Sequence, residues 1–538
     1  MHGYRLILAS LRYYWRTHLG VAVGVALATA TLTGALLMGD SVDASLRKLA
    51  LQRLGRVDLA IDTRQQYVDA SLADRLAGEL GVRGVAVLRL AGAMRQAVGP
   101  DARRVGDITV LGVTPAFWEM ADGPIRGLTP TEIALSVKLA RALGAQPGDE
   151  VALRVAAPTL LPQDAPLASK TGPASRQGVF TVAAVVPDSQ LGRFSLRAEQ
   201  LAPYNAFVDL QWLQSRTDLP GKANVVLLES SPGKSINMAA ADQALQRVYR
   251  LADAGLGLHL REHGVVQLES ERIFLPELIG VAALRLKLPE GGEPVGALTY
   301  LVNRIHNPAK PDAATPYSFV SALSPSQGDS LGLAPADLPD DGLLASQWLA
   351  DACNLGPGDD VEIAYFRLSP TNTFVEHTRR FTVHAILDME TLQAERRLIP
   401  PFPGLSEVES CADWEIGMPM DEEALADPAN EAYWERYRET PKAIISLAAG
   451  QEMWGSRFGN LTAVRYSAVY SPAIIEETLR RELSPDMLGI SLQPVRQIAL
   501  EATRQAMDFG GLFLGMSFFL IVAALMLTAL LFVFGVQH

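Results

Sequence analysis

Two histidines and a glutamate near the middle of the chain have the spacing of a zinc peptidase motif. The segment His259-Leu-Arg-Glu262-His263 matches the pattern H-x-x-E-H. That chemistry needs both histidines on one face of a helix, where they can bind one zinc ion. Leucines at alternate positions over residues 256–260 instead predict a half-buried strand, on which residues four apart are separated by about 13 Å. We therefore expect no metal site and no zinc hydrolase activity.

A phosphate-binding loop is suggested by Gly233-Lys234-Ser235, which stands between a predicted strand and a predicted helix. The full pattern requires a further glycine five residues before Gly233, and that position is Leu228. We therefore expect no nucleotide site in this segment.

The two cysteines, Cys353 and Cys411, are too few to build a disulfide scaffold. A single disulfide between them stays open as an alternative. Cys353 stands at the position of Leu143 in an earlier, similar segment, which favours a buried thiol. No Ser/His/Asp spacing, dinucleotide loop or paired-carboxylate motif stands out, so we expect no enzyme, no catalytic residues and no cofactor bound to this chain.

Composition narrows the class of protein. The 538 residues include 47 Lys and Arg and 59 Asp and Glu, which gives a formal charge of −12. Charged residues make up 20%, below the roughly 25% of ordinary soluble proteins. The acidic balance disfavours binding to nucleic acid, which needs a basic surface. The mean hydropathy is positive, at +0.14, so the next step is to locate the apolar residues along the chain.

Two uncharged apolar stretches, residues 19–38 and 510–536, are each long enough to cross a membrane. A hydrocarbon core about 30 Å thick needs about twenty residues of helix. A buried core helix is the alternative for either stretch, and a cleaved signal peptide is a second alternative for the first. The first stretch exceeds the usual apolar region of a signal peptide, so we predict two retained transmembrane helices.

The N-terminal arm, residues 1–18, carries Arg5, Arg12 and Arg16 and no acidic residue, whereas Asp40 and Asp43 follow the first span. Positive charge beside a span is typical of the cytoplasmic side, so the N-terminus is predicted to lie in the cytoplasm. On a helix the three arginines share one face, which also predicts an amphipathic arm at the membrane interface. The alternative is that the arginines set the topology alone.

Each span carries a Gly-xxx-Gly pair, Gly20/Gly24 in the first and Gly511/Gly515 in the second. Such pairs let helix backbones approach closely, so we predict helix-packing surfaces. The first pair lies near the inner membrane surface and the second near the outer one. Each pair therefore needs a different partner helix, which this chain does not contain.

The region between the spans contains an internal repeat. Residues 133–155 and 343–365 align with an offset of 210, and both contain a Pro-Gly-Asp turn between a predicted helix and a predicted strand. Four further blocks match in the same order along the chain, and they begin at residues 113 and 323, 180 and 381, 224 and 460, and 256 and 488. Five blocks in one order predict a duplicated domain.

The predicted fold is α+β, with two transmembrane helices flanking a large extracytoplasmic region made of two duplicated α+β lobes. The predicted boundaries are a cytoplasmic or interfacial amphipathic arm at 1–18, transmembrane helix 1 at 19–38, lobe 1 at 39–280, lobe 2 at 281–509 and transmembrane helix 2 at 510–536.

These features together resemble a known family. Residues 6–61, which run from LILASLRYYW through the first span to LGRVDLAI, are similar to the start of FtsX-like ABC transporter permeases. Residues 508–532, beginning DFGGLFLGMSFF, resemble the second membrane helix of those permeases, which opens their four-helix permease domain. The Pro-Gly-Asp and Phe-Thr-Val blocks between them resemble the MacB-like periplasmic core domain.

The resemblance implies a permease subunit, or the N-terminal part of one, in the inner cell membrane. In such systems a separate cytoplasmic ATPase binds the ATP and drives motion of the exterior domain, for export or extraction of a substrate. The implied partners are this ABC ATP-binding subunit, membrane lipid, and a second permease copy or the remaining membrane helices. The cytoplasmic loop and later spans of the family are absent from these 538 residues, so we expect a longer protein or a second polypeptide. A two-span exterior sensor or binding protein without an ATPase is the alternative.

Overall fold

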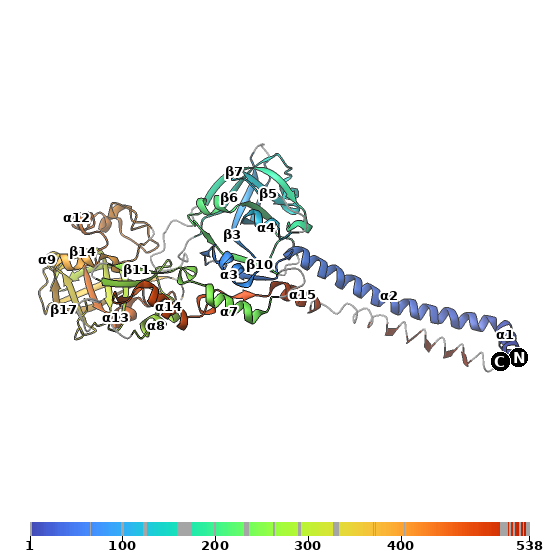
Figure 1. The fold of residues 1–538 in the computed structure, drawn as a ribbon. Coiled ribbons are helices and arrows are strands. Elements are labelled where there is room, and N and C mark those ends of the chain that lie inside the picture. Colours follow the sequence, from blue (N-terminus) through green and yellow to red (C-terminus); the bar gives the residue numbers. More distant parts are fainter. Residues whose placement is uncertain are drawn as a thin grey trace.

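A long N-terminal helix leads into two lobes, each built around a nine-stranded sheet (Figure 1). The computed structural model describes residues 3–64, 66–97, 102–121, 126–158, 175–197, 201–230, 236–261, 264–288, 292–326, 333–369, 371, 373–402 and 404–505, together with single helical residues between 515 and 533.

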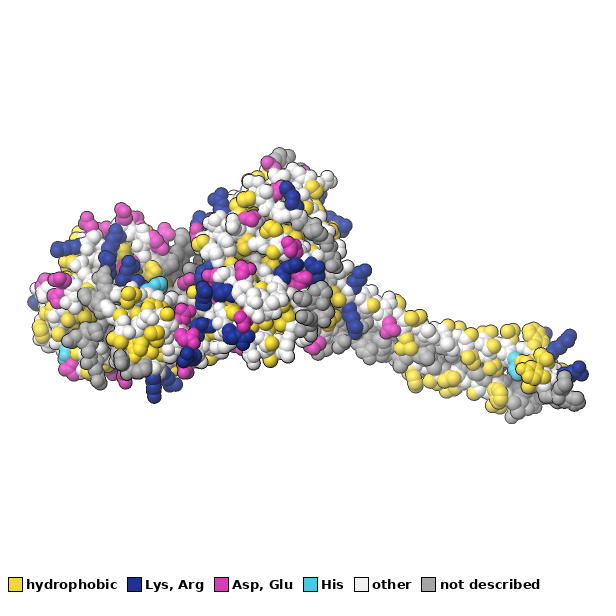
Figure 2. Space-filling model, viewed as in Figure 1, with side chains coloured by type: hydrophobic (Ala, Val, Ile, Leu, Met, Phe, Trp, Pro, Cys, Tyr) yellow, Lys and Arg dark blue, Asp and Glu magenta, His cyan; other side chains and the backbone are white. Residues whose placement is uncertain are grey.

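The N-terminal helices project away from both lobes. Helix α1 (Gly3–Tyr13) is followed by α2 (Trp15–Leu54), which has 40 residues and is therefore about 60 Å long. Of the described helices, α2 alone is long and apolar enough to span a membrane, by length and composition. Its apolar side chains are exposed along the projecting part (Figure 2). The second predicted span, 510–536, lies largely outside the described residues.

The first sheet has the strand order β20-β1-β10-β3-β4-β8-β5-β7-β6, and β6 also pairs with β3, so the last six strands close into a barrel. Its strands are β1 (Leu59–Asp62), β3 (Arg83–Gln96), β4 (Arg104–Val113), β5 (Glu132–Ser136), β6 (Glu150–Ala156), β7 (Ser175–Val186), β8 (Asn205–Asp209), β10 (Val225–Glu229) and β20 (Leu492–Gln493).

The second sheet has the order β11-β12-β19-β13-β14-β18-β15-β17-β16, and β16 also pairs with β13. Its strands are β11 (Leu256–Arg261), β12 (Val265–Ser270), β13 (Val295–Asn307), β14 (Lys310–Leu323), β15 (Gly342–Ser346), β16 (Asp360–Leu368), β17 (Phe374–Leu387), β18 (Ala443–Ser446) and β19 (Ala463–Ser467). The short strands β2 (Val68–Asp69) and β9 (Lys222–Ala223) form a separate pair.

Helices connect and cover these strands. The first lobe carries α3 (Leu72–Leu80), α4 (Pro115–Trp118), α5 (Val137–Leu143), α6 (Leu210–Arg216) and α7 (Met238–Val248). The second carries α8 (Glu277–Leu284), α9 (Gln347–Cys353), α10 (Met389–Ala394), α11 (Glu422–Leu425), α12 (Pro428–Tyr437), α13 (Leu447–Trp454) and α14 (Pro472–Glu482), and α15 (Val495–Gln505) follows β20. Short 3-10 turns are η1 (Asp188–Gln190), η2 (Leu251–Ala254), η4 (Arg396–Leu398), η5 (Cys411–Asp413) and η6 (Asp486–Leu488).

The two sheets share local details as well as strand order. In the first lobe β5 runs parallel to β7, and in the second lobe β15 runs parallel to β17. In both pairs the register of the strand pairing shifts after the second residue of the shorter strand. β5 and β15 each end in a serine that caps the following helix. Ser136 accepts a hydrogen bond from the Leu139 amide, and Ser346 accepts one from the Leu349 amide.

The lobes exchange strands at their boundaries. β11 and β12 precede residue 281, yet both belong to the second sheet. β20 lies within the predicted second lobe, residues 281–509, yet it belongs to the first sheet. The structural boundary within the chain therefore does not coincide with the predicted division between 280 and 281. The sequence blocks showed which segments match, but strand pairing across lobes is a long-range contact that block order does not specify.

Candidate functional site at the base of the first lobe

The C-terminal end of α2 is built into the core of the first lobe. Leu54 and Val57 are fully buried, in a cluster that includes Trp118 of α4. Gly55 ends the helix with a φ of +56°, and a Cβ at this position would lie 2.6 Å from the carbonyl oxygen of Met120. Only glycine fits such a turn. The helix therefore enters the lobe as a fixed element.

The chain returns to the same place after the second lobe. β20 pairs with β1 at the edge of the first sheet, where Leu492 lies opposite Ile61. α15 then begins, and its Val495 and Ala499 are buried in the same cluster as Leu54. α15 also packs against α2. Both connections toward the predicted spans therefore join the first lobe.

Arg496 ties these two connections together. Its Nε lies 2.7 Å from Oδ1 of Asp58, and its Nη2 donates a hydrogen bond of 2.6 Å to the carbonyl oxygen of Gly55. Oδ2 of Asp58 accepts a hydrogen bond of 2.9 Å from the amide of Ser230. A cation at the carbonyl end of a helix is stabilising, because the helix dipole is negative there. One side chain thus links the end of α2 to the start of α15.

A second ion-pair group flanks the same helix end. Glu229, at the end of β10, lies 2.9 Å from Nε of Arg56 and 3.0 Å from Nη1 of Arg83. The glutamate is largely buried, whereas both arginines are nearly half exposed. Solvent screening limits each of these pairs to about 1 kcal/mol or less. The group therefore orients the helix end more than it stabilises the lobe.

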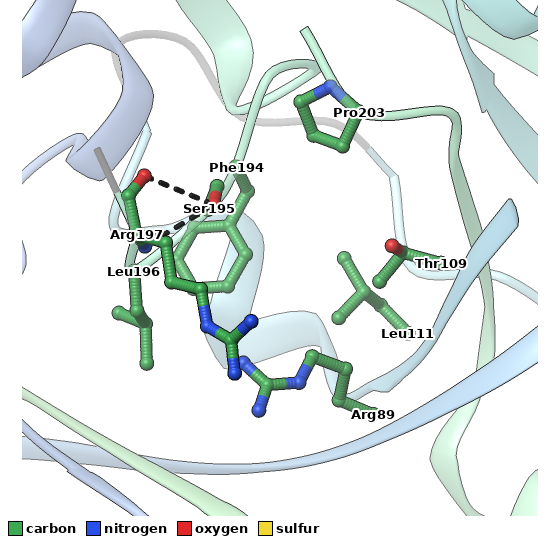
Figure 3. A pocket seen from close by; sticks show the side chains of 8 residues that line it. All are labelled: Arg89, Thr109, Leu111, Phe194, Ser195, Leu196, Arg197 and Pro203. Atoms are coloured by element: carbon green, nitrogen blue, oxygen red, sulfur yellow. Dashed lines mark hydrogen bonds between the residues drawn. The ribbon is translucent and has the colours of Figure 1, made fainter. Parts of the chain in front are cut away.

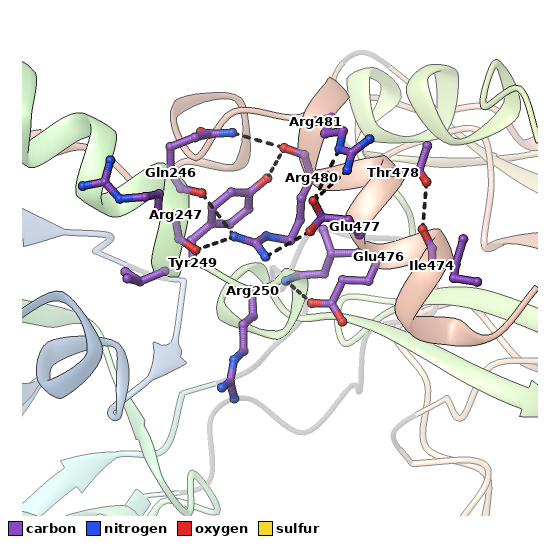
Figure 4. A network of polar contacts seen from close by, with 12 residues as sticks. Gln246, Arg247, Tyr249, Arg250, Ile474, Glu476, Glu477, Thr478, Arg480 and Arg481 are labelled. Atoms are coloured by element: carbon purple, nitrogen blue, oxygen red, sulfur yellow. Dashed lines mark hydrogen bonds and ion pairs between the residues drawn. The ribbon is translucent and has the colours of Figure 1, made fainter. Parts of the chain in front are cut away.

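The two lobes meet where the ends of α7 and α14 face each other (Figure 4). The Tyr249 hydroxyl donates to the carbonyl oxygens of Arg480 and Leu483. Gln246 donates to the Arg480 carbonyl at 3.1 Å, and the Arg480 guanidinium donates to the carbonyl oxygens of Gln246 and Arg247. The guanidinium also lies 4.8 Å from the Tyr249 ring centroid, and burial raises the pKa of this tyrosine to about 12. The contact satisfies carbonyls at both helix ends.

The predicted membrane-interface and helix-packing residues lie on or near the projecting helices. Arg5 and Arg12 are on α1 and Arg16 is on α2, all three exposed. Gly20 and Gly24 are on α2 within the predicted span. The described helical residues include Gly515, and Gly511 lies outside them. Their roles in packing and at the interface stay predictions.

We call the place where the end of α2 meets β20 and the start of α15 the junction. A cavity of ≈ 200 Å³ lies near it in the first lobe (Figure 3). The guanidinium groups of Arg89 and Arg197 point toward each other, and Leu111 and Phe194 also line the cavity. Arg89 is already paired with Asp62 at 2.6 Å. The cavity is smaller than typical ligand pockets of about 300–1,000 Å³. It therefore supports no substrate site.

The motifs with catalytic appearance do not assemble in the described residues. His259 lies on β11 opposite Gln267, which confirms the predicted strand, and the partners Glu262 and His263 lie outside the described residues, as does Gly233-Lys234-Ser235. Among the described residues no three His, Cys, Asp or Glu side chains could hold a metal ion together. Cys353 and Cys411 are both buried and free, which confirms the buried thiol at Cys353.

A buried lysine in the second lobe was not anticipated from the sequence. Lys442 is 1% exposed, and its Nζ donates to Oγ1 of Thr315 at 2.8 Å and to Oδ1 of Asn430 at 2.6 Å. The amine also lies 4.3 Å from the ring centroid of Trp348 and 4.7 Å from that of Tyr433. Burial lowers the pKa of Lys442 to about 7. A single lysine before a strand carries no pattern that would reveal such an environment.

Arg496 and Tyr249 were likewise missed, because their partners are far away in the chain. Arg496 contacts a residue 441 positions before it, and Tyr249 contacts residues more than 230 positions after it. One sequence feature pointed to both residues. The repeat blocks that begin at 256 and 488 match each other, and Tyr249 lies just before the first block while Arg496 lies just after the start of the second.

Part of this chain is similar to a described domain family. Residues 17–247 match the model of the MacB-like periplasmic core domain, so the matched region begins in α2 and ends in α7. No curated protein sequence matches the chain.

Two solved structures show a distant similarity. The periplasmic region of MacB from Actinobacillus actinomycetemcomitans is 13% identical, with a TM-score of 0.24, over 37% of this chain and 85% of that chain. The extracellular domain of the noncanonic ABC-type transporter YknZ from Gram-positive bacteria is also 13% identical, with a TM-score of 0.23, over 36% of this chain and 91% of that chain.

Proposed function

We propose that the chain is a permease subunit, or the N-terminal part of one, of an FtsX/MacB-type ABC transporter, because residues 17–247 match the model of the MacB-like periplasmic core domain. In this proposal a separate cytoplasmic ATPase binds the ATP, and its cycle moves the exterior lobes for export or extraction of a substrate. The chain itself carries no catalytic role.

The observation that carries this proposal is the convergence of both chain connections at one junction. α2 enters the first lobe at Gly55, and α15 leaves it beside the same residue, held by Arg496. About 24 Å of continuous helix, residues 39–54, separates the predicted span from the lobe. A change in the relation of the two spans would therefore act on the first lobe directly. The second lobe would follow through the α7–α14 contact and the exchanged strands.

The proposed topology places the N-terminus in the cytoplasm and both lobes outside. The exposed apolar surface of α2 supports a first span, and the apolar stretch 510–536 is the proposed second span. The remaining permease helices would come from a continuing chain or another polypeptide.

We also propose that the exterior arose by duplication of one unit. In support, the two nine-stranded sheets have the same order, and their helix caps and strand irregularities recur at matching positions. The first unit then runs from β1 to β11 and the second from β12 to β20, with the last strand of each unit placed in the sheet of the other.

The test uses the full chain co-expressed with candidate ABC ATPase subunits of the FtsX/MacB type. The proposal predicts that the ATPase co-purifies with the chain in detergent and that its turnover changes at least threefold when α15 is released by Arg496→Ala. Arg481→Ala, in the exposed part of α14, serves as the control and should leave the turnover unchanged.

Failure of any such ATPase to associate would contradict the proposal. That result would favour a two-span exterior sensor or binding protein, in which the same lobes work without ATP.

A further inference from the structure

The cavity beside the junction brings two cations together. Arg89 lies on β3, and Arg197 lies on the segment that follows η1. Figure 3 shows the two guanidinium groups in the same cavity, pointing toward each other. Two like charges that face each other repel. The arrangement is therefore unfavourable unless an anion lies between the two groups.

A single carboxylate of the described residues balances this pair of cations. Nη2 of Arg89 lies 2.6 Å from Oδ1 of Asp62, and the same oxygen accepts a hydrogen bond of 3.1 Å from the amide of Arg64. Arg197 forms no ion pair with a carboxylate in the part of the chain that the structure describes. One of the two facing positive charges therefore remains without a counterion there.

The wall between the two arginines is polar as well as charged. Leu111 of β4 pairs with Arg89 of β3, and Thr109 stands two residues before Leu111, so all three side chains share one face of the sheet. The Thr109 hydroxyl forms no hydrogen bond within the described residues. The Ser195 hydroxyl, by contrast, is already bonded to the backbone of Arg197, at 3.2 Å. Thr109 therefore has a hydroxyl to offer to a ligand.

The segment that carries Arg197 is held in place by contacts within the lobe. Phe194 is 3% exposed, and Nδ2 of Asn205 donates to the carbonyl oxygens of Gly192 and Phe194, at 3.2 and 2.9 Å. The guanidinium of Arg53, in the last turn of α2, donates to the carbonyl oxygen of Arg197. The cavity is therefore preformed, which lowers the cost of binding a ligand.

From these features we propose that the cavity binds one phosphate-class oxyanion between Arg89 and Arg197. Each guanidinium presents a planar fork of N–H groups that can donate to two oxygens of such an ion. The four oxygens of phosphate can accept both forks and the Thr109 hydroxyl together, whereas a carboxylate has only two. The volume of ≈ 200 Å³ is too small for a substrate, but it holds an ion of this size with a few waters, at about 30 Å³ each.

The anion also affects the helix that leads to the predicted first span. Arg53 of α2 holds the backbone of Arg197, so an anion that fixes the Arg197 side chain also fixes this contact. Occupancy of the cavity therefore tightens the attachment of α2 to the first lobe. The inference goes beyond the proposed function and does not rest on it, because every group that it uses lies in the first lobe or at the end of α2.

The first experiment measures binding to the full chain by isothermal titration calorimetry, in uncharged detergent and in a buffer without phosphate or sulfate. Sodium phosphate is expected to bind at least roughly tenfold tighter than sodium acetate or sodium chloride at equal ionic strength. Glycerol phosphate distinguishes two sources of the same chemistry. If it binds as tightly as phosphate, the site takes the phosphate of a larger molecule, and if it binds much more weakly, the site takes the free ion.

Variants then locate the site. Arg197→Gln removes one of the facing charges and should weaken phosphate binding roughly tenfold or more. Thr109→Val keeps the shape of the side chain, removes its hydroxyl and should weaken binding roughly fivefold. The matched control is Arg216→Gln, which removes an exposed arginine of α6 that does not line the cavity, and it should bind phosphate normally.

Thermal unfolding separates a ligand site from a structural role of Arg197. Without phosphate, Arg197→Gln should be at least as stable as the unchanged chain, because the substitution relieves the repulsion with Arg89. Added phosphate should raise the melting temperature of the unchanged chain and of Arg216→Gln, but not that of Arg197→Gln. In the unchanged chain, phosphate should also slow amide hydrogen exchange in the last turn of α2.

Unchanged phosphate binding in Arg197→Gln would overturn the proposal, and so would a stabilisation that sodium chloride reproduces at equal ionic strength. A loss of stability in Arg197→Gln without phosphate would also contradict it, because Arg197 would then support the fold by itself. None of these measurements needs an ATPase. The anion site and the permease can therefore fail independently of each other.

Discussion

At the scale of single residues, the second lobe keeps an ionisable amine in a fully buried place. Lys442 is held by two oxygen acceptors and two aromatic rings. The first lobe has a related contact with the roles exchanged, since Lys138 lies 4.3 Å from the ring of Tyr204. Trp348 stands at the position of Lys138 with the offset of 210. The lysine therefore stands on the helix position in the first lobe and just before the strand in the second, and the aromatic residue takes the other position in each lobe.

The buried amine predicts a pH-dependent stability of the second lobe. The pKa of Lys442 is about 7 in the folded chain, against an ordinary value of 10.5. Between these values the unfolded chain binds more protons, so the free energy of unfolding should rise as the pH rises through this window. The gain is complete above pH 10.5 and lost as the pH falls through 7.

Lys442→Met should remove this rise, which amounts to about 5 kcal/mol at most. Urea unfolding at a series of pH values measures it. Lys310→Met, at an exposed lysine on β14, is the control and should keep the rise. An unchanged pH profile in Lys442→Met would show that the amine is not the source.

Gly55 offers a second test at the residue scale. Gly55→Ala should destabilise the first lobe by about 2–4 kcal/mol, because the left-handed φ and a close backbone contact both oppose a side chain. Gly81 also has a positive φ, of +64°, but no atom lies within 4 Å of its Cβ position. Gly81→Ala should therefore cost only about 1–2 kcal/mol. Thermal unfolding of both variants gives the comparison, and equal costs would argue against a tight turn at Gly55.

At the scale of elements, the junction depends on two segments that are short by themselves. β20 has two residues and α15 has eleven, and neither would be stable alone. They are ordered because β20 adds to an existing sheet edge and α15 buries Val495 and Ala499 against α2. The elements that connect to the second span are therefore the ones most dependent on tertiary contacts.

Arg496→Ala should loosen these elements selectively. The variant loses the ion pair with Asp58 and the hydrogen bond to the Gly55 carbonyl, at an expected cost of about 1–3 kcal/mol. Amide hydrogen exchange should accelerate in α15 and β20 and stay unchanged in the barrel strands β4 and β8. Uniform acceleration over the whole first lobe would mean that Arg496 stabilises the lobe rather than the junction.

At the scale of the whole molecule, the contact between the lobes has approximate two-fold character. Gln246 and Arg480 occupy matching places near the ends of α7 and α14, and they bind each other's carbonyl oxygens. Tyr249 and Leu483 follow the two helices at matching places and are also in contact. The exchanged strands β11 and β20 obey the same relation. Such reciprocal contacts are typical of isologous interfaces, here within one chain.

Tyr249→Phe tests this contact. The variant leaves two carbonyl groups without their hydroxyl donor, which should cost about 1–2 kcal/mol and increase hydrogen exchange at the ends of α7 and α14. Tyr433→Phe is a matched control, because that hydroxyl donates to the Thr440 carbonyl between α12 and β18. Its effect should stay within the second lobe. If exchange at α7 is the same in both variants, the contact does not hold the lobes together.

Much of the molecule was predictable from local pattern. The repeat around residues 133–155 and 343–365 appears as matching strands and helices, the leucines of 256–260 form a strand, and Cys353 is buried like Leu143. The sequence-based hypothesis of a MacB-like domain is confirmed over residues 17–247. These succeed because hydrophobic periodicity and turn residues act over a few neighbours.

The sequence by itself determined the apolar stretches, the acidic balance and the order of the repeated blocks, since each depends on residues close together in the chain. Only the tertiary structure decided which sheet each terminal strand joins and that residues 55 and 496 meet. Those features depend on contacts between distant segments, and the entropy lost in closing such long loops is regained only when the complete sheets and cores form.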